Sequence, residues 1–420
     1  MKILHTSDWH LGKMLYSRTR HEEQARFLDH LCTVLQEEQV RVLVVAGDVF
    51  DTLSPSCRSQ QLYYGFLARL AALPQLDDVV IVAGNHDSPA FLSAPQALLD
   101  HFRIHVITAP GAGRELLTLR GRRNVPYLVV AAVPYLREAD VRTSAFGESA
   151  AARATGYRQG VCDHYRQLAA QAREAARQGG ARLPVIATGH LFAAGGRPLQ
   201  AARGAAPAVV GTLEAVPGED LGAGFAYTAL GHLHGAQAVG GLNHVRYSGS
   251  PLPLSFAELG RGKKLVLVEL DEDAGPGPAA GGVHIRELPV PCFQELAALC
   301  GDADAITAEL GALIASGRPV WVEVSCTAAA PPDDLAERIR DMADGTCVSV
   351  LAIRIRTQAA PTLERSGGPE VLAQLDPDEV FRGFLEDRGV PLPEREGYAA
   401  TFNELRAALA MQAEREAKGD

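Results

Sequence analysis

Five short apolar runs, all before residue 235, each stop at residues that could bind a metal ion. The runs cover residues 3–7, 42–46, 79–83, 185–188 and 227–230. The side chains that follow them are carboxylates, an amide and imidazoles: Asp8, His10, Asp48, Asn85, His86, His190, His232 and His234. Oxygen and imidazole donors without a thiolate suit borderline divalent ions such as Mn²⁺, Fe²⁺ or Zn²⁺. The chemistry indicated is hydrolysis supported by divalent ions.

Two ions in one centre need a ligand that they share, and Asp48 is the best candidate because it follows the central run. A carboxylate can bridge ions about 3.5–4 Å apart, and such a pair stabilises both the attacking and the leaving oxygen of a phosphoryl transfer. Asp8 and His10 are two residues apart and can reach one ion together. The same spacing in His232 and His234 allows one imidazole to reach each ion. The pattern predicts a two-metal phosphoesterase.

Asn85 and His190 complete the predicted ligands with an amide oxygen and an imidazole from separate loops. His86 directly follows Asn85, so we expect it to act beside the ions, as a general acid or as a donor to the transition state. Each feature is common by chance when it stands alone, since a lone histidine is more often a core or surface residue than a ligand. Their repetition behind five apolar runs favours the metal centre.

The elements that must position these residues follow from the apolar spacing. Continuous Val-rich runs are typical of parallel strands buried on both faces, and ligands bind at the carboxyl ends of such strands. Residues 21–39 and 60–73 carry apolar side chains at helical spacing and predict right-handed crossovers. The alternation continues through a helix near 95–102, strands at 104–107 and 127–133, and a helix over 157–177. From residue 227 onward, strands with short turns, including 244–247 and 264–270, predict an antiparallel meander.

The rest of the chain predicts two further parts. A Gly- and Pro-rich stretch at 271–282 indicates a linker or a long hairpin. After it, helices at 306–314 and 335–342 and strands at 320–326 and 348–355 predict a small α/β module. The last segment holds two short amphipathic helices, 377–387 and 400–418, whose apolar faces need a partner or the body of the chain to cover them. We therefore expect domains at 1–271, 283–358 and 370–420.

Size and charge limit the possible functions. A chain of 420 residues can form two or three domains. A formal charge of −10 argues against wrapping nucleic acid through bulk electrostatics, so any DNA contact must be local or supplied by a partner. Seven scattered cysteines indicate reduced thiols. We find no signal-peptide core and no run long enough to span a membrane, and expect a cytoplasmic protein without membrane association.

The motifs D-x-H, G-D-x-x-D, G-N-H-D, G-H and G-H-x-H resemble those of the calcineurin-like metallophosphoesterase superfamily. The resemblance implies an α/β fold: a metallophosphoesterase-type β-sheet sandwich flanked by helices, then a small α/β capping module and C-terminal helices. It implies one ion on Asp8, His10, Asp48 and His234, the other on Asp48, Asn85, His190 and His232, and a catalytic role for His86. The role of Asp51, the second carboxylate of G-D-x-x-D, stays open between the centre and the capping of a turn.

The amino-acid sequence at 5–12, 46–52, 83–88 and 244–251 is similar to that of DNA nucleases within this superfamily. This similarity implies two Mn²⁺ ions, double-strand exonuclease and hairpin or single-strand endonuclease activity in DNA recombination, replication and repair, and a heterotetramer or similar assembly with a coiled-coil ATPase. It also suggests a homodimer through the nuclease domain. The candidate surface for that dimer is Leu62, Phe66, Leu67 and Leu70, which could equally be the face that packs on the sheet.

A basic loop after the first motif, with Lys13, Arg18 and Arg20 around Tyr16, offers local contacts for a phosphate backbone, although an ordinary solvated loop would look the same. Two other functions are compatible with parts of this pattern. One is a two-metal phosphatase or phosphodiesterase acting on small molecules or proteins, and the other is a non-catalytic scaffold. The complete ligand set with His86 argues against the scaffold, and the additional module argues against a minimal phosphatase.

Overall fold

The computed structural model describes residues 1–357 except 112, 122–123, 145–146, 179–182, 198–214, 272–281, 329–331 and 333. The chain divides after Gln358, and the helices expected within 370–420 lie outside the described residues. No described helix is both long enough and apolar enough to cross a membrane.

The first layer is a six-stranded sheet in the order β14-β13-β1-β2-β3-β4. Its strands are β1 (Lys2–Thr6), β2 (Val42–Ala46), β3 (Asp78–Val82), β4 (Ile104–Ile107), β13 (Lys264–Leu270) and β14 (Val283–Pro289). Strands β1 to β4 are parallel, as their unbroken apolar runs predict, whereas β13 runs antiparallel to both β1 and β14. Three of the five predicted site motifs follow β1, β2 and β3 and therefore lie at the same edge of this sheet.

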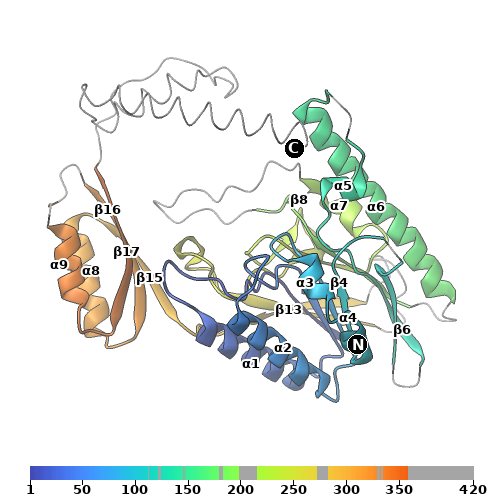
Figure 1. Ribbon diagram of the computed structural model, residues 1–420, viewed down its shortest axis with the longest axis horizontal. Coiled ribbons are helices and arrows are strands. Elements are labelled where there is room, and N and C mark those ends of the chain that lie inside the picture. Colours follow the sequence, from blue (N-terminus) through green and yellow to red (C-terminus); the bar gives the residue numbers. More distant parts are fainter. Residues whose placement is uncertain are drawn as a thin grey trace, which may run out of the picture. The chain divides into compact units, whose positions relative to one another are not determined.

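The outer face of the first sheet is covered by helices α1 (His21–Glu37) and α2 (Cys57–Ala71), and the short helices α3 (Pro89–Ser93) and α4 (Gln96–His101) follow β3 (Figure 1). The apolar side chains of α1 and α2 are buried against the sheet, as their helical spacing predicts. Phe66, Leu67 and Leu70 belong to this core and Leu62 is partly buried. The α2 face suggested as a dimer surface is thus the face that packs on the sheet.

The second layer is another six-stranded sheet, in the order β11-β12-β10-β7-β6-β5. Its strands are β5 (Leu116–Arg120), β6 (Pro126–Ala131), β7 (Val185–His190), β10 (Tyr227–Gly231), β11 (Gln237–Val239) and β12 (Leu242–Tyr247). Helix α6 (Ala150–Gln178) packs on its outer face, with α5 (Glu138–Val141) and α7 (Gly218–Gly222) beside it. Strands β8 (Ala193–Ala194) and β9 (Val216–Pro217) form a separate pair, and a 3-10 turn covers Phe256–Glu258.

The prediction of an antiparallel meander after residue 227 is only partly right. Strand β10 runs parallel to both β7 and β12, while antiparallel pairing occurs between β11 and β12 and around β13. Strand β10 is buried along its whole length, which is the environment of a central parallel strand. The short connections predicted that successive strands pair with each other, but β13 belongs to the first sheet while β10, β11 and β12 belong to the second.

The two sheets pack face to face around a shared apolar layer. Side chains from both sheets meet in it, including Val44 and Val80 from the first sheet and Val130, Ile186 and Ala229 from the second. The predicted α/β sandwich flanked by helices is therefore confirmed. Because both sheets bury their inner faces, a motif at one strand end can meet a motif from the opposite sheet.

The module that follows has its own core. Strands β15 (Glu295–Gly301), β16 (Val320–Ala328) and β17 (Val348–Thr357) form a parallel sheet, packed by α8 (Ala303–Ala315) and α9 (Leu335–Ala343). We did not predict β15. Residues 283–289, at the start of the part expected at 283–358, form strand β14, which pairs antiparallel with β13 and completes the first sheet.

Candidate metal centre

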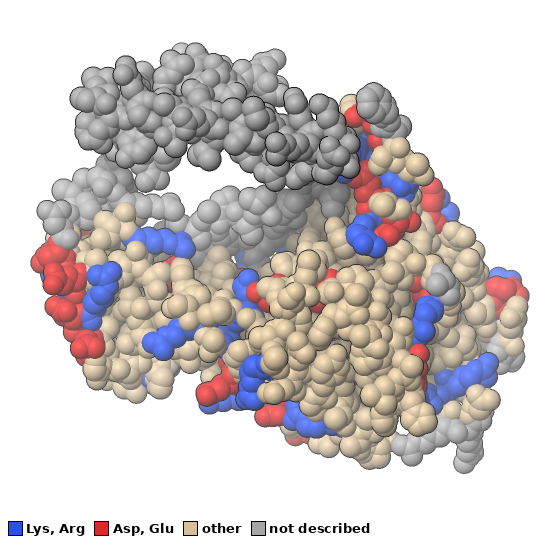
Figure 2. Space-filling view, in the orientation of Figure 1, with Lys and Arg blue, Asp and Glu red and all other residues tan. Residues whose placement is uncertain are grey.

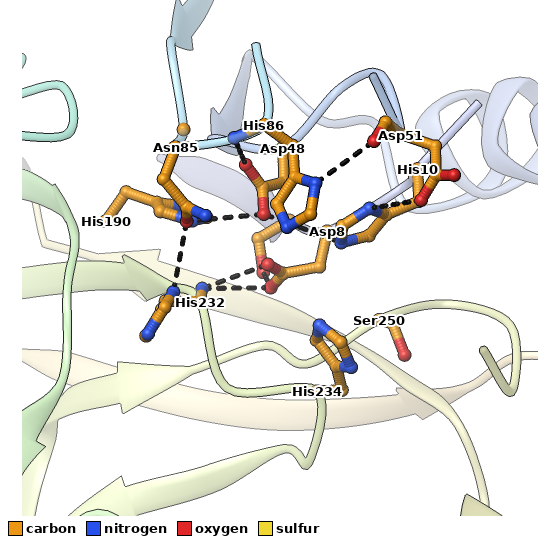
Figure 3. A network of polar contacts seen from close by, with 12 residues as sticks. Asp8, His10, Asp48, Asp51, Asn85, His86, His190, His232, His234 and Ser250 are labelled. Atoms are coloured by element: carbon orange, nitrogen blue, oxygen red, sulfur yellow. Dashed lines mark hydrogen bonds and ion pairs between the residues drawn. The ribbon is translucent and has the colours of Figure 1, made fainter. Parts of the chain in front are cut away.

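The predicted site residues come together where the carboxyl ends of β1, β2 and β3 meet those of β7 and β10 (Figure 3). Asp8 and Asp48 lie at the centre of the cluster in this view. Asn85, His190 and His232 lie on one side of them, and His10 and His234 on the other. The site is thus built between two sheets, whereas strand-end reasoning placed it at the edge of one.

The carboxylate of Asp48 stands between imidazoles from the two sheets. Its Oδ2 lies 3.5 Å from His10 Nε2 and 3.3 Å from His190 Nε2. Its Oδ1 accepts a hydrogen bond of 2.9 Å from the backbone N–H of His86. One oxygen is therefore directed at both groups of donors, which is the position that a bridging carboxylate requires.

Asp8 is the second buried carboxylate of the cluster. It accepts hydrogen bonds from the backbone N–H of His232 at 3.0 and 3.2 Å and from the hydroxyl of Ser7 at 2.5 Å. The potential ligand atoms of Asp8, His10 and His234 lie within 4.8 Å of one another. The same holds for Asp8 with Asp48 and His190.

The amide of Asn85 joins two imidazoles on the other side of the cluster. Its Oδ1 lies 3.0 Å from His190 Nε2 and 3.2 Å from His232 Nδ1. His86, its neighbour, is exposed, and its ring centroid lies 4.9 Å from that of His10. Because a ring nitrogen of His86 also lies within 4.8 Å of a ring nitrogen of His10 and a carboxylate oxygen of Asp48, geometry alone leaves a ligand role for His86 open.

Glycines in the motifs allow the loops to approach closely. A Cβ added to Gly84 would lie 2.1 Å from Asp48 Oδ1, and one added to Gly231 would lie 1.9 Å from the carbonyl oxygen of Ala46. The backbone of Asp8, His10 and Asp48 is also in the left-handed region, with φ of 53°, 44° and 52°. Such conformations are costly for residues other than glycine and concentrate at functional sites.

Buried negative charge governs the protonation of the histidines. Burial lowers the pKa of His190, but the Asp48 carboxylate outweighs this effect and raises the pKa to about 9. Burial also opposes protonation of His10, yet its contact with Asp51 and the charges of Asp48 and Asp8 raise its pKa. Burial and the neighbouring His190 lower the pKa of His232 to about 4.

The donors fit divalent cations. His10 Nε2 is buried and has no hydrogen-bond partner among the described residues, although a carboxylate lies 3.5 Å away. Asp8 and Asp48 are buried carboxylates, and within the described part of the chain their ion pairs and hydrogen bonds involve neither lysine nor arginine. Cations placed among oxygen and imidazole donors would offset this charge.

Three acidic residues position the centre without belonging to it. The first, buried Asp87, accepts hydrogen bonds from the backbone N–H groups of Val49, Phe50 and Gly84, at 3.1, 2.9 and 2.9 Å. It thereby joins the loop that carries Asp48 to the loop that carries Asn85. The fourth residue of the G-N-H-D motif was visible in the sequence, but its role depends on contacts that only the fold creates.

The second is Asp51, whose role the sequence left open. Its Oδ1 lies 3.2 Å from His10 Nδ1 and 3.1 Å from Lys13 Nζ, and its backbone carbonyl lies 3.0 Å from His86 Nδ1. Asp51 therefore contacts two histidines of the centre, and outer contacts of this kind orient the rings of metal ligands.

The third, Glu258, has the same relation to His234. Its Oε1 lies 3.0 Å from His234 Nδ1, and its Oε2 lies 2.6 Å from Lys263 Nζ. Burial opposes its ionisation, but the contacts with His234 and Lys263 lower its pKa to about 2. No sequence signal identified Glu258, because it lies outside the motifs and 24 residues from His234.

The basic loop differs from the prediction in one position. Arg20 is buried, with its guanidinium held by both carboxylate oxygens of Glu23, so it does not present a surface to a phosphate. This residue is a correction to the predicted nucleic-acid contacts. Lys13 pairs with Asp51 and is partly exposed, while Arg18 is exposed. These two stay candidates.

Fold and site together define a calcineurin-like phosphoesterase, and the comparison with family models agrees. The model for calcineurin-like phosphoesterases matches residues 1–141. A second model, described as a type 5 capsule protein repressor C-terminal domain, matches residues 292–388. The first match contains the motifs of β1, β2 and β3, and the family implies binding of divalent metal.

Curated relatives identify the particular family. The SbcD component of the nuclease SbcCD from Escherichia coli K12 is 35% identical over 92% of each chain. The protein of the same name from Rhodobacter capsulatus is 39% identical over 69% of each chain, and that from Bacillus subtilis is 38% identical over 67% of this chain and 68% of its own. The chain belongs to the SbcD family.

Proposed function

We infer that the chain is a metal-dependent nuclease subunit that hydrolyses phosphodiester bonds in DNA. The observation that carries this inference is the Asp48 carboxylate, whose Oδ2 lies 3.5 Å from His10 Nε2 and 3.3 Å from His190 Nε2. A shared carboxylate between two groups of donors is the arrangement of two-metal phosphoryl transfer. The relatives are named as components of a nuclease, which favours nucleic acid over other phosphoesters.

We propose that two Mn²⁺ ions are the native cofactors. The first would be held by Asp8, His10, Asp48 and His234, and the second by Asp48, Asn85, His190 and His232. The grouping of Asp8, His10 and His234 within 4.8 Å supports the first set. The contacts of Asn85 with His190 and His232 support the second. Ions bound there would neutralise charge on the phosphate and acidify water.

His86 is proposed as the proton donor to the leaving oxygen or as a hydrogen-bond donor to the transition state. It is exposed beside the ligands, and its Nδ1 lies 3.0 Å from the carbonyl oxygen of Asp51. In the doubly protonated ring, Nδ1 donates to this carbonyl and leaves the proton of Nε2 free for the substrate. Asp51 would thus orient the ring while His86 moves the proton.

The substrates we propose are DNA ends and hairpins, cut by double-strand exonuclease and by hairpin or single-strand endonuclease activity during recombination, replication and repair. The relatives' name refers to an SbcCD complex, so we propose a cytoplasmic assembly, a heterotetramer or similar, with an SbcC-like coiled-coil ATPase. On the face shown in Figure 2, Lys and Arg are interspersed with Asp and Glu, and no single basic field covers the described residues. Local contacts and a partner's surface would therefore have to hold the duplex.

We also propose a homodimer through the nuclease domain, with a different surface from the one the sequence suggested. Leu98, on α4, is 62% exposed, and Phe102, which caps the same helix, is 49% exposed. Residues four apart on a helix lie on one face, and large exposed apolar pairs are typical of interaction sites. This face is a better candidate than the buried side of α2.

The replacement Asp48→Asn tests the function. Because it removes the shared charge, we expect two-ion binding to be lost and Mn²⁺-stimulated cleavage of linear duplex DNA to fall at least about 100-fold. Asp163→Asn, on an exposed helix surface, is the matched control and should keep both. Metal content by mass spectrometry and duplex degradation would be measured together. Near wild-type cleavage with two ions bound to Asp48→Asn would refute the proposal, and cleavage of small phosphoesters without DNA would favour a phosphatase.

A further inference from the structure

A pocket of about 360 Å³ lies beside the metal centre, and His234 is the one proposed metal ligand among its described lining residues. It is lined by the loops that follow β10 and β12 and by the turns before β13 and after β8. The described residues that line it include four basic side chains and no carboxylate. His234 belongs to both sites, since its ring also groups with Asp8 and His10.

The basic residues of the pocket fall into two kinds. The side chain of Lys263 is largely buried, and its Nζ lies 2.6 Å from Glu258 Oε2 and 2.7 Å from Ser250 Oγ. Lys264 pairs with Glu287. Arg197 and Arg261 are exposed, and neither guanidinium has an ion-pair or hydrogen-bond partner among the residues that the structure describes.

The local structure holds the pocket and one of these arginines in place. The side chain of Gln237 accepts from the backbone N–H of Arg197 at 2.8 Å and donates to its carbonyl at 2.9 Å. Gly249, with φ of 74°, allows the loop after β12 to approach His234, because a Cβ there would lie 2.7 Å from the carbonyl oxygen of His234. Ser250 lies next to His234 in Figure 3, and its backbone N–H donates to the same carbonyl at 3.2 Å.

We propose that this pocket binds a second phosphate of the substrate strand, away from the phosphate that is cleaved. A single small phosphoester would reach the metal centre and leave the pocket empty. A nucleic-acid strand repeats its phosphates, so a strand held at the centre can continue past His234 to Arg197 and Arg261. Arginine guanidinium groups suit phosphate oxygens because they can donate two parallel hydrogen bonds. This inference rests on the proposed function and specifies a polymeric phosphodiester as the substrate.

The experiment compares the double variant Arg197→Gln/Arg261→Gln with the double variant Arg177→Gln/Arg318→Gln in the full chain. The control removes the same charge from side chains that are 75% and 63% exposed on α6 and before β16. Binding of a fluorescent thymidine strand of about 20 nucleotides, long enough to pass both the centre and the pocket, would be measured by anisotropy in EDTA at several salt concentrations. Turnover of bis(p-nitrophenyl) phosphate with Mn²⁺ would be measured in parallel.

We expect the pocket variant to bind the strand about tenfold or more weakly, and the slope of log K against log salt to fall by about 0.7, the contribution of one single-strand phosphate contact. Turnover of the small diester should stay at the wild-type value. The single replacement Gln237→Ala, which keeps the charges but frees the backbone of Arg197, should weaken binding by a smaller factor.

Strand affinity and salt slope equal to those of the control would overturn the proposal, as would an equal loss of small-diester turnover, which would assign the arginines to the metal centre. A failure of the proposed function would give a different result. If the chain is not a nuclease, the wild-type protein would turn over the small diester without binding the strand, and the pocket would have no nucleic-acid ligand.

Discussion

Asp87 offers a sharp test of how the fold holds the metal centre, because it is not among the proposed ligands. Its Oδ2 accepts from the backbone N–H groups of Val49 and Gly84, and its Oδ1 from that of Phe50. Replacement by alanine leaves three buried donors without their acceptor. In an asparagine variant, the side-chain oxygen can take the position of Oδ2 and keep the bonds to Val49 and Gly84. The NH₂ group then takes the position of Oδ1, where it faces the N–H of Phe50 and cannot accept its hydrogen bond.

The magnitudes follow from this count. A hydrogen bond to a charged group contributes about 1.5–3 kcal/mol, and water that enters after truncation reduces the sum. We expect Asp87→Asn to lower the free energy of unfolding by roughly 2 kcal/mol and Asp87→Ala by roughly 4 kcal/mol. The alanine variant should also bind Mn²⁺ about 10- to 100-fold more weakly, because the loops that carry Asp48 and Asn85 lose their common support.

Urea unfolding and calorimetric titration with Mn²⁺ would measure both effects. Burial and the nearby Asp48 charge raise the pKa of Asp87 to about 6, so the measurements belong at about pH 8, where the carboxylate is ionised. Asp29→Asn, at an exposed side chain that pairs with Arg69, is the control and should stay within about 0.5 kcal/mol. An alanine variant with wild-type stability and metal affinity would show that Asp87 does not join the two loops.

Three further predictions concern catalysis, assembly and pH. His86→Gln should keep both ions but lose at least about 100-fold in cleavage rate, and loss of metal with activity would make His86 a ligand. Leu98→Glu/Phe102→Glu should convert a dimer to a monomer in light scattering while Leu53→Glu, at a similarly exposed leucine, does not; a wild-type monomer at micromolar concentration would contradict the dimer. Burial lowers the pKa of His5 from 6.5 to about 3, so the unfolded chain takes up a proton first as the pH falls below 6.5. The contribution of His5 to stability should then decline by about 1.4 kcal/mol per pH unit between about pH 6.5 and 3, and His5→Gln should show a flatter slope in urea unfolding at about pH 5 and pH 7.5.

The helices and strands around the centre were predictable because their signals are local. The apolar spacing of α1 and α2 and the unbroken runs of β1, β2 and β3 each reflect one buried environment that neighbouring residues share. Strand β15 was missed because it is only partly buried along most of its length and lacks such a run. Strand β14 was not predicted, and its residues fell within the part expected at 283–358, because its partner β13 lies across the Gly- and Pro-rich stretch.

The sequence by itself determined which residue types could bind metal and where each follows a strand, because strand ends and motif spacing are properties of short segments. The tertiary structure alone decided which of those ends face each other, since that depends on two sheets that bury a common layer. It placed Asp48 between His10 and His190, and it brought Glu258 to His234. It also buried Arg20, which forms an ion pair with Glu23. Each of these contacts joins segments through packing, or buries a charge that would otherwise be solvated, and neither effect leaves a periodic signal in the chain.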